Sequence, residues 1–361
     1  MKKLTVLMLA LALALCFSVA ASAKVTIKLA NSGPDRPDNR TVKAVAIFKD
    51  MVEKGTNGEV EVKAYHASKL GNEREALEGV KMGTIQMGTL SSGAVPGFFQ
   101  EVMAFDIPYF VSSAPAAWEV FESPFAEKFK DAFLKKTGVR ILGITENGYR
   151  HFTNGVREVK VPKDMEGLKV RTMENPAHMA MVKSLGANPT PVPFGELYMA
   201  LQQNVVDAME CPIVLIYDMK FYEVQKYMTL DGHLYNPLFI FINDRFYNKK
   251  LTPEQQKVVA DAAKVMVMTH AGFSQLANRE GLDKLKAKGM QVYKPTPEEL
   301  AQFRKLAQPA GLEFIQGKIG KEWVDGALEA AKVAEVKVGD KADAIVQQHI
   351  DKAQELYKKI K

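Results

Sequence analysis

The sequence predicts an α/β protein with two lobes, preceded by an N-terminal export signal. Two observations predict the α/β class: strand and helix patterns alternate along the chain, and they do so in two tandem groups. A third predicts two lobes, because a chain of 361 residues with 47% hydrophobic residues can bury the cores of two domains. We expect the sheets to be largely parallel.

The N-terminus has the order of a secretory signal peptide. Lys2 and Lys3 precede an apolar run from Leu4 to Val19, and small residues close the run up to Ala23. The run is shorter than the roughly 20 residues of a membrane-spanning helix. We therefore expect cleavage after Ala23 and a periplasmic mature protein.

Cys16 raises the alternative of a lipoprotein. A lipobox carries Gly or Ala immediately before the cysteine, whereas Leu15 stands there in this sequence. The better cleavage site lies further along, so a soluble mature protein is the preferred interpretation.

The first tandem group combines two kinds of periodicity. Apolar residues spaced along one helical face end at Gly55, and the next segment alternates charged and apolar residues as a strand does. We expect strands at Val25–Ala30, Glu59–Tyr65, Ile85–Leu90 and Val139–Thr145, and helices at Val42–Val52, Glu73–Met82 and Ala114–Lys136.

The second group repeats the alternation and ends in long helices. The last helix carries apolar residues at spacings of three and four, which is typical of an amphipathic helix that caps a domain. We expect a strand at Leu168–Arg171, helices at Ala177–Leu185, Phe194–Gln203, Pro253–Lys288 and Pro297–Gln316, and a final helix that includes Val346–Ile360.

Composition argues against nucleic acid, metal and disulfides. Removing residues 1–23 takes away Lys2 and Lys3 and no acid, so the formal net charge falls from +6 to +4. No basic block with interleaved aromatics is present, and no His/Cys cluster has metal-ligand spacing. Cys211 is the only cysteine of the mature chain. We expect no cofactor.

Enzyme signatures are also missing. The sequence contains no Walker loop, no G-x-G-x-x-G after a strand, no H-E-x-x-H and no G-x-S-x-G. A nucleophilic site of Cys211 with His151 or His233 stays open as an alternative, although their spacing does not support it.

Arg150 and Arg171 are the most informative charged residues. Both fall at the ends of expected strands, where open α/β sheets place their ligand crevice. A guanidinium matches the two oxygens of a carboxylate, so either arginine could read an organic acid. The residues alone leave open that each pairs with a nearby acid on the surface.

A family resemblance adds to this interpretation. The chain resembles the solute-binding proteins of tripartite ATP-independent periplasmic (TRAP) transporters, which include dicarboxylate- and sialic-acid-binding members. The resemblance covers nearly all of residues 24–315. It is carried by Ala64–Gly71, Asp106–Phe110, Asn147–Arg150, Gly167–Arg171, Leu185–Pro191, Phe194–Tyr198, Ala200–Gln203, Val205–Asp207 and Lys220–Tyr227.

The resemblance implies a type II-like periplasmic binding protein with hinge strands, a long connecting helix and C-terminal helices. It assigns a two-pronged salt bridge with the ligand carboxylate to Arg171, and a supporting role to Arg150. Phe194 matches the aromatic residue that packs on the ligand, and Asn31 matches a polar contact from the other lobe. Asn236, in the second crossing segment, is a further expected ligand contact.

Cys211 departs from the family pattern. Many members carry an asparagine at this place, so one amide contact to the ligand is lost. With Phe194, Tyr235 and Phe98-Phe99 available, monocarboxylates and 2-oxo acids with aromatic side chains stand level with C4-dicarboxylates.

The expected lobes are discontinuous in sequence. Lobe I takes residues 24–148 plus 237–276, and lobe II takes 149–236 plus 277–361. The lobes are expected to close on a small carboxylate, and the closed form to dock on the small and large membrane subunits of a TRAP transporter. A periplasmic enzyme acting on an organic acid and a ligand sensor without transport stay open as alternatives.

Overall fold

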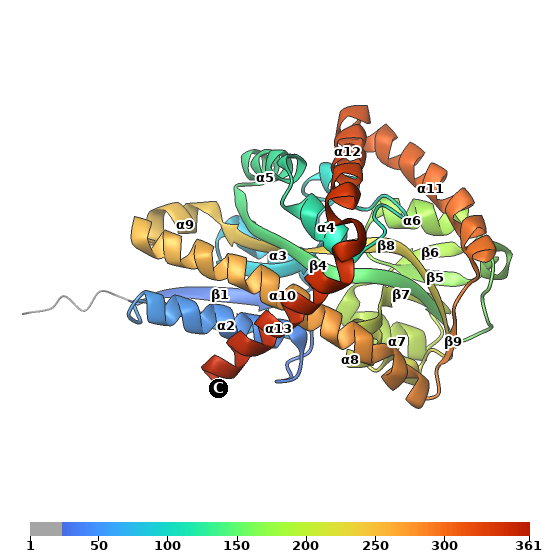
Figure 1. The fold of residues 1–361 in the computed structure, drawn as a ribbon, viewed down its shortest axis with the longest axis horizontal. Helices are drawn as coiled ribbons and strands as arrows, with labels where there is room; N and C mark the ends of the chain where they lie inside the picture. The colour runs from blue at the N-terminus through green and yellow to red at the C-terminus, as the bar shows by residue number, and fades with distance from the viewer. Residues whose placement is uncertain (1–23) are drawn as a thin grey trace, which may run out of the picture.

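The computed structural model describes residues 24–361 (Figure 1). The expected signal peptide and its cleavage after Ala23 lie outside the described residues. Among the helices of residues 24–361, none is long and apolar enough to cross a membrane.

One sheet of nine strands runs through residues 24–361. Its order is β2-β1-β3-β8-β4-β7-β5-β6, and β9 pairs with β8. The strands are β1 (Val25–Asn31), β2 (Val60–Tyr65), β3 (Met87–Ser91), β4 (Val139–Asn154), β5 (Lys169–Thr172), β6 (Asn188–Pro191), β7 (Ala208–Pro212), β8 (Tyr227–Asn243) and β9 (Gln291–Tyr293).

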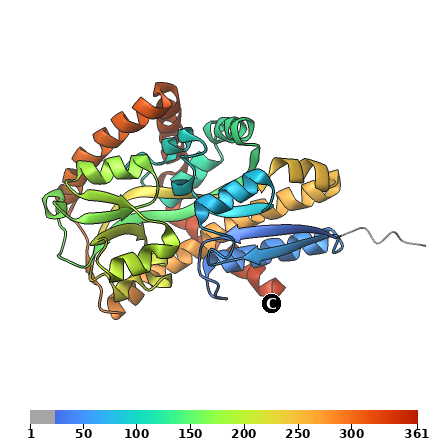
Figure 2. The ribbon, with the colours of Figure 1, turned by 180° about the vertical axis from the view of Figure 1, so that it is seen from behind.

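Helices cover both faces of this sheet (Figures 1 and 2). They are α2 (Arg40–Gly55), α3 (Glu73–Met82), α4 (Ala114–Phe121), α5 (Pro124–Thr137), α6 (Pro176–Ser184), α7 (Leu197–Gln202), α8 (Ile213–Asp218), α9 (Asp244–Lys250), α10 (Pro253–Ala287), α11 (Pro297–Ile319), α12 (Lys321–Val338) and α13 (Ala342–Ile360).

The long strands β4 and β8 join two halves of the sheet. They pair antiparallel along their whole lengths. The C-terminal part of β8 pairs with β3 in the first half, while the C-terminal part of β4 pairs with β7 in the second half. The expectation of largely parallel sheets was therefore incomplete, because the two crossing strands run in opposite directions and bring antiparallel pairing into the centre.

The pairing of β4 with β8 is irregular where the strands cross between the halves. The register shifts between Glu146 and Gly148, opposite Pro237 of β8. Proline cannot donate to the ladder and is tolerated at such an irregularity. Gly148 has a φ of 113°, which an L side chain rarely adopts. The two strands can therefore bend here, at the expected crossing near Thr145–Tyr149.

Each half of the sheet has its own hydrophobic core. In the first half, one cluster includes Phe48 and Ile240, and another includes Phe105 and Phe239. In the second half, one cluster includes Phe152, and another packs around α8. The chain thus forms two independently packed halves joined by shared strands.

Most sequence-predicted elements are confirmed, but several of their bounds differ. The expected strand Val139–Thr145 continues to Asn154 as β4. The expected helix Ala114–Lys136 is two helices, because Ser123 caps a new helix with Pro124 at its first position. The expected helix Phe194–Gln203 begins with a 3-10 turn over Phe194–Glu196 and becomes α-helical only in α7.

The C-terminal helices pack on the first half more than expected. Helix α10, capped by Thr252 and Gln255, runs along α2, β4 and α8 and so touches both halves. Helix α12 packs on α4, and α13 packs on α10, α2 and α4. The expected second lobe included residues 277–361, whereas these contacts place α12 and α13 beside the first half (Figure 1).

Candidate functional site

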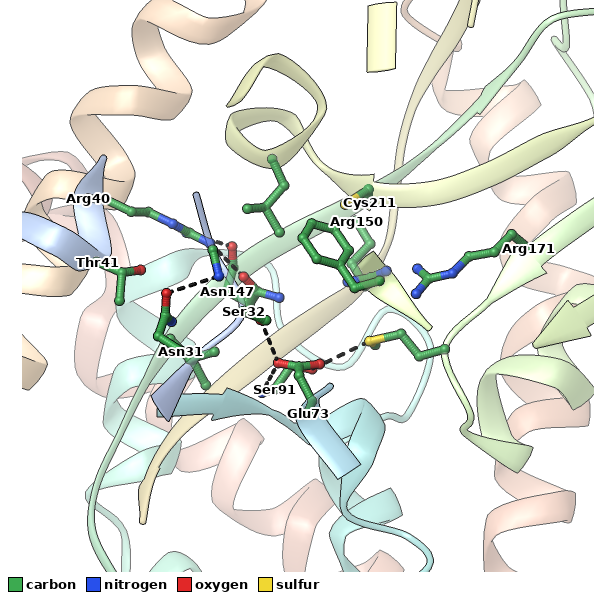
Figure 3. Close-up of a pocket in the computed structure, with 15 residues that line it drawn as sticks. Asn31, Ser32, Arg40, Thr41, Glu73, Ser91, Asn147, Arg150, Arg171 and Cys211 are labelled. Carbon is green, nitrogen blue, oxygen red and sulfur yellow. Dashed lines mark hydrogen bonds between the residues drawn. The ribbon is translucent and has the colours of Figure 1, made fainter. Parts of the chain in front are cut away.

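A cavity of about 470 Å³, a volume that includes its opening to solvent, lies between the two halves (Figure 3). Several of its residues stand at or next to the carboxyl ends of parallel strands β1, β3, β5 and β7, where α/β sheets expose side chains to a crevice. The lining residues are Asn31, Ser32, Gly33, Arg40, Thr41, Glu73, Ser91, Asn147, Arg150, Arg171, Met173, Phe194, Cys211, Leu215 and Leu238.

Arg171 presents a cation to this cavity. The side chain is 1% exposed, and its Nε donates to the carbonyl of Val192 at 2.8 Å. Within residues 24–361, no carboxylate lies in salt-bridge distance of the guanidinium, whose terminal nitrogens point toward the cavity (Figure 3). Burial lowers the pKa of Arg171 to about 10. A buried charge is costly unless paired, so Arg171 is prepared for an anion.

Arg150 has a partner already. It is 1% exposed and forms a salt bridge with the buried Glu210, donating to Glu210 Oε1 at 3.0 Å and to the Glu210 carbonyl at 2.6 Å. Burial alone would lower the pKa of Arg150, but the charge of Glu210 outweighs it and the pKa is raised. Burial would raise the pKa of Glu210, but Arg150 holds it below its usual range. Arg150 therefore contributes a compensated positive charge to the cavity wall.

Asn236 lies behind the cavity wall. Its Oδ1 accepts from Asn147 Nδ2 at 2.9 Å and from Arg150 Nη1 at 3.4 Å, and its Nδ2 donates to Ser92 Oγ at 2.7 Å. It is absent from the cavity lining. These bonds hold Asn147 and Arg150 in place, so the structure puts Asn236 beside the wall-forming residues and not in the wall.

Phe194 and Cys211 both line the cavity next to the arginines. Phe194 meets Phe221 edge-to-face, with ring centroids 6.0 Å apart. Cys211 is 1% exposed, and burial raises the pKa of its thiol to about 11. A neutral thiol is a weak nucleophile.

The alternative nucleophilic site is not assembled. His151 is opposite Cys211 in the β4–β7 ladder, but its Nδ1 accepts from the Gly232 N–H at 3.0 Å. His233 is bound to Asp231 at 2.7 Å. Among residues 24–361, neither histidine hydrogen-bonds Cys211, and no group of three or more His, Cys, Asp or Glu side chains could hold a metal.

Asn31 shapes the loop that follows β1. Its Oδ1 accepts from the Gly33 N–H at 2.9 Å and lies 3.4 Å from His66 Nδ1, while its Nδ2 donates to the Thr89 carbonyl at 3.4 Å. A Cβ at Gly33 would stand only 3.1 Å from Asn31 Oδ1. Asn31 thus lines the cavity from the first half, and its contact with a ligand stays a prediction.

The expected aromatic residues at the far end are not in the cavity. Tyr235, Phe98 and Phe99 belong to the core around α4 and α5, and the Tyr235 hydroxyl donates to Glu146. Leu215 and Leu238 line the cavity in their place.

Sequence reasoning missed Arg40 and Glu73. Arg40 is 4% exposed and donates to the Asn147 carbonyl at 2.9 Å and Oδ1 at 2.5 Å, and to Ser274 Oγ at 3.0 Å. It begins α2, where a positive charge opposes the helix dipole, and this placement was a usable signal. Glu73 begins α3, where an acid suits the dipole, so nothing in the sequence separated it from an ordinary helix start.

Direct contacts between side chains hold the two halves together. Arg36, in the loop after β1, donates to Asp218 Oδ1 at 2.7 Å, and Asn39 Nδ2 donates to Asp218 Oδ2 at 2.8 Å. On the other side, a Cβ at Gly93 would lie 2.3 Å from Met173 Sδ. The absence of a side chain at residue 93 permits this close approach of the halves.

Comparison with known proteins identifies the family. Residues 34–317 match the family model described as bacterial extracellular solute-binding protein, family 7. The chain belongs to this family. The chain is similar to the C4-dicarboxylate-binding periplasmic protein DctP of Rhodobacter capsulatus, which is 31% identical over 327 residues, covering 89% of this chain and 96% of the relative.

Solved structures with the same fold confirm the TRAP resemblance and the two-lobed α/β class. The sugar acid binding protein of Advenella mimigardefordensis, in complex with galactonate, has a TM-score of 0.83 and 32% identity, covering 86% of this chain and 99% of that one. A TRAP periplasmic solute binding protein of a Polaromonas species, bound to D-erythronate, has a TM-score of 0.79 and 33% identity, covering 84% and 98%. This family 7 protein is thus a TRAP solute-binding protein.

Proposed function

We propose that this protein captures a small organic carboxylate between its two lobes and delivers it to a TRAP transporter in the membrane. The observation that carries this proposal is Arg171, a buried cation that faces the cavity and has no paired carboxylate within residues 24–361. An anionic ligand would supply the missing partner.

A carboxylate fits the two terminal nitrogens of Arg171, which are free within residues 24–361. The Nε–H is held by the Val192 carbonyl, so the fork of Nη1 and Nη2 is left to face the two oxygens of a planar group. Hydrogen bonds to charged groups contribute roughly 1.5–3 kcal/mol each, and part of this is offset by ordering of the ligand and the lobes. Related proteins with bound galactonate, D-erythronate and succinate are consistent with this choice.

Lobe closure is the proposed signal to the transporter. The first lobe is proposed to comprise residues 24–148 and 237–276 together with helices α12 and α13, which pack against it. The second lobe is proposed to comprise residues 149–236 and 277–319. A ligand that bridges Arg171 of the second lobe and the Asn31 side of the first would favour the closed arrangement. The closed surface would then be recognised by the small and large membrane subunits.

The proposed location is the periplasm, after removal of residues 1–23. We also propose that the ligand is released unchanged, because the cavity offers charge recognition and no activated nucleophile among its described residues. Mass spectrometry of bound acids after prolonged incubation would detect turnover and so contradict this point.

The central test is calorimetry on the mature chain with a panel of organic acids. Arg171→Ala should abolish binding of every acid that the wild type binds while the unliganded melting temperature stays close to that of the wild type. Arg245→Ala removes an exposed arginine far from the cavity lining and should leave affinity unchanged. Unchanged affinity in Arg171→Ala would refute the assignment.

A further inference from the structure

We propose that Glu73 makes this site selective for polyhydroxylated monocarboxylates, the sugar-acid class, over dicarboxylates and plain fatty acids. The inference rests on the proposed function, because it takes Arg171 as the partner of the ligand carboxylate. The role of Glu73 concerns the other groups of the ligand, beyond its carboxylate, that the site recognises.

Glu73 is a carboxylate built into the cavity wall. Its Oε1 accepts from the Ser91 N–H at 2.9 Å and from Ser32 Oγ at 3.3 Å, and its Oε2 accepts from Ser91 Oγ at 2.8 Å. Three donors from two separate segments thus fix both oxygens. A carboxylate offers about four acceptor positions, so capacity is left for a donor from the cavity.

No cation neutralises Glu73 at short range. Within residues 24–361, no lysine, arginine or histidine lies in salt-bridge distance of its carboxylate. Arg171 and Glu73 both line the cavity (Figure 3), and the charge of Glu73 acts on Arg171 only from beyond salt-bridge distance. A ligand held by Arg171 therefore extends toward a wall that already carries a negative charge.

The cavity is divided by polarity. The wall contributed by the first half is polar and includes Asn31, Thr41 and Asn147 beside Glu73 and Ser91. The wall contributed by the second half, next to Arg171, is apolar and includes Met173, Phe194 and Leu215. A ligand with its carboxylate at Arg171 therefore packs its carbon skeleton on one wall and presents its substituents to the other.

Hydroxyl groups match the polar wall because each both donates and accepts. A hydroxyl can donate to Glu73 and accept from a donor beside it, such as the second N–H of the Asn31 amide, whose first donates to the Thr89 carbonyl. A ligand without hydroxyls would displace the water that hydrogen-bonds Glu73 and the polar side chains beside it, and would leave these groups without partners. Sites built to hydrogen-bond a hydroxyl therefore bind analogues that lack it much more weakly.

A second carboxylate fits this wall poorly. Placed near Glu73, it would oppose a like charge in a site removed from water. Arg40 is the cation that could offset this repulsion, but its guanidinium already donates to the carbonyl and side chain of Asn147 and to Ser274. A dicarboxylate would have to compete for those bonds.

The test uses two probe sets of matched length, measured by calorimetry on the full mature chain. The six-carbon set is D-galactonate, D-gluconate, hexanoate and adipate, and the four-carbon set is D-erythronate, butyrate and succinate. Within at least one set, a hydroxylated acid should bind at least tenfold more tightly than the plain acid and the diacid.

Glu73→Gln keeps the size of the side chain and removes its charge. It should weaken binding of the preferred hydroxy acid by roughly tenfold or more, and leave the diacid of the same length unchanged or strengthened. Glu78→Gln, on the exposed side of the same helix, is the matched control and should change neither. Ser32→Ala leaves α3 untouched and should cause a smaller loss for hydroxy acids, which keeps the test valid if Glu73→Gln folds poorly.

The outcomes separate the two proposals. Equal affinity for hydroxylated, plain and dicarboxylic acids in the wild type would overturn the role of Glu73 and leave capture of carboxylates by Arg171 intact. So would a Glu73→Gln variant that folds and binds the hydroxy acid as the wild type does. If none of the seven acids binds while another acid of the wider panel does, this inference fails and capture of carboxylates by Arg171 stands. If no acid of the wider panel binds, both fail.

Discussion

Arg36 and Asp218 join the two halves of the protein, with Nη2 of the arginine 2.7 Å from Oδ1 of the aspartate. Asp218 ends α8 and is 9% exposed, whereas Arg36 is 36% exposed. The same carboxylate accepts from Asn39, the residue that caps α2. One acidic side chain of the second half thus binds two donors of the first.

Asp218→Asn should speed ligand release. The variant keeps the size of the side chain and weakens the bonds to Arg36 and Asn39, so the closed form loses stability relative to an open one. Partly exposed ion pairs contribute about 1 kcal/mol or less, which corresponds to a dissociation rate raised by roughly three- to fivefold. Stopped-flow displacement would measure this rate.

Asp38→Asn is the control for that prediction. Asp38 accepts from Nε of the same guanidinium at 3.2 Å, and its side chain is 72% exposed. Asp38 does not bridge the halves, so the ligand should dissociate from Asp38→Asn at the wild-type rate. Equal rates in Asp218→Asn and Asp38→Asn would show that the Arg36–Asp218 contact does not hold the closed form.

Glu210→Gln should destabilise the fold strongly. The substitution leaves the buried Arg150 without its counter-ion, and breaking a buried pair in this way costs about 3–5 kcal/mol. Urea denaturation of the unliganded protein would measure the loss. The double variant Arg150→Met/Glu210→Gln should recover part of the lost stability, because Arg150 is then no longer buried as an unpaired charge. If the losses of the two single variants simply add in the double variant, this explanation is wrong.

The stability of the protein should fall as the pH rises toward 9. Burial would lower the pKa of His233, but Asp231 and Glu210 outweigh it and raise the value to about 9. A histidine whose folded-state pKa is raised stabilises the protein fully below its unfolded value near 6.5, and this contribution is lost as the pH passes through about 9.

Urea midpoints at pH 7, 8 and 9 would check the His233 prediction. His233→Gln should be less stable than the wild type at pH 7, and its midpoint should change less with pH over this range. Parallel pH profiles for the two proteins would mean that His233 is not charged in the folded state.

Cys211→Asn should shift ligand preference toward more polar acids. Cys211 lines the cavity as a neutral thiol, and an asparagine there would add a hydrogen-bonding amide to the wall. Calorimetry with the matched acid sets would show a larger gain for hydroxylated acids than for hexanoate or butyrate. An unaltered order of affinities would argue that residue 211 does not contact the ligand.

The sequence predicted the local elements better than their connection. Helix starts with clear chemistry, such as Thr252-Pro253 and Thr296-Pro297, were located correctly because their capping residues act within one turn. The continuity of β4 was not, since the expected strand stopped at Thr145. The second part of β4 carries the charged Arg150, which is not typical of a buried strand. Arg150 can be buried there because it donates hydrogen bonds to Glu210 of β7 and Asn236 of β8, which are distant in sequence.

The candidate site shows the same division. Arg171, Arg150, Phe194, Cys211 and Asn31 all line the cavity, and residue patterns together with the family resemblance located them. Glu73 and Arg40 could not be ranked in the same way. Their importance depends on Ser91 and Asn147, which are distant in sequence and come together only when the sheet forms.

The double crossing by β4 and β8 has a consequence for protein engineering. Because each lobe draws its sheet from both strands, neither lobe is a contiguous gene segment, and a cut at residue 148 would separate each half from a central strand of its own core. Chimeras made by exchanging one lobe with that of a relative should therefore misfold. Redesign of ligand preference has to proceed by side-chain replacement around the cavity, with the shared strands left intact.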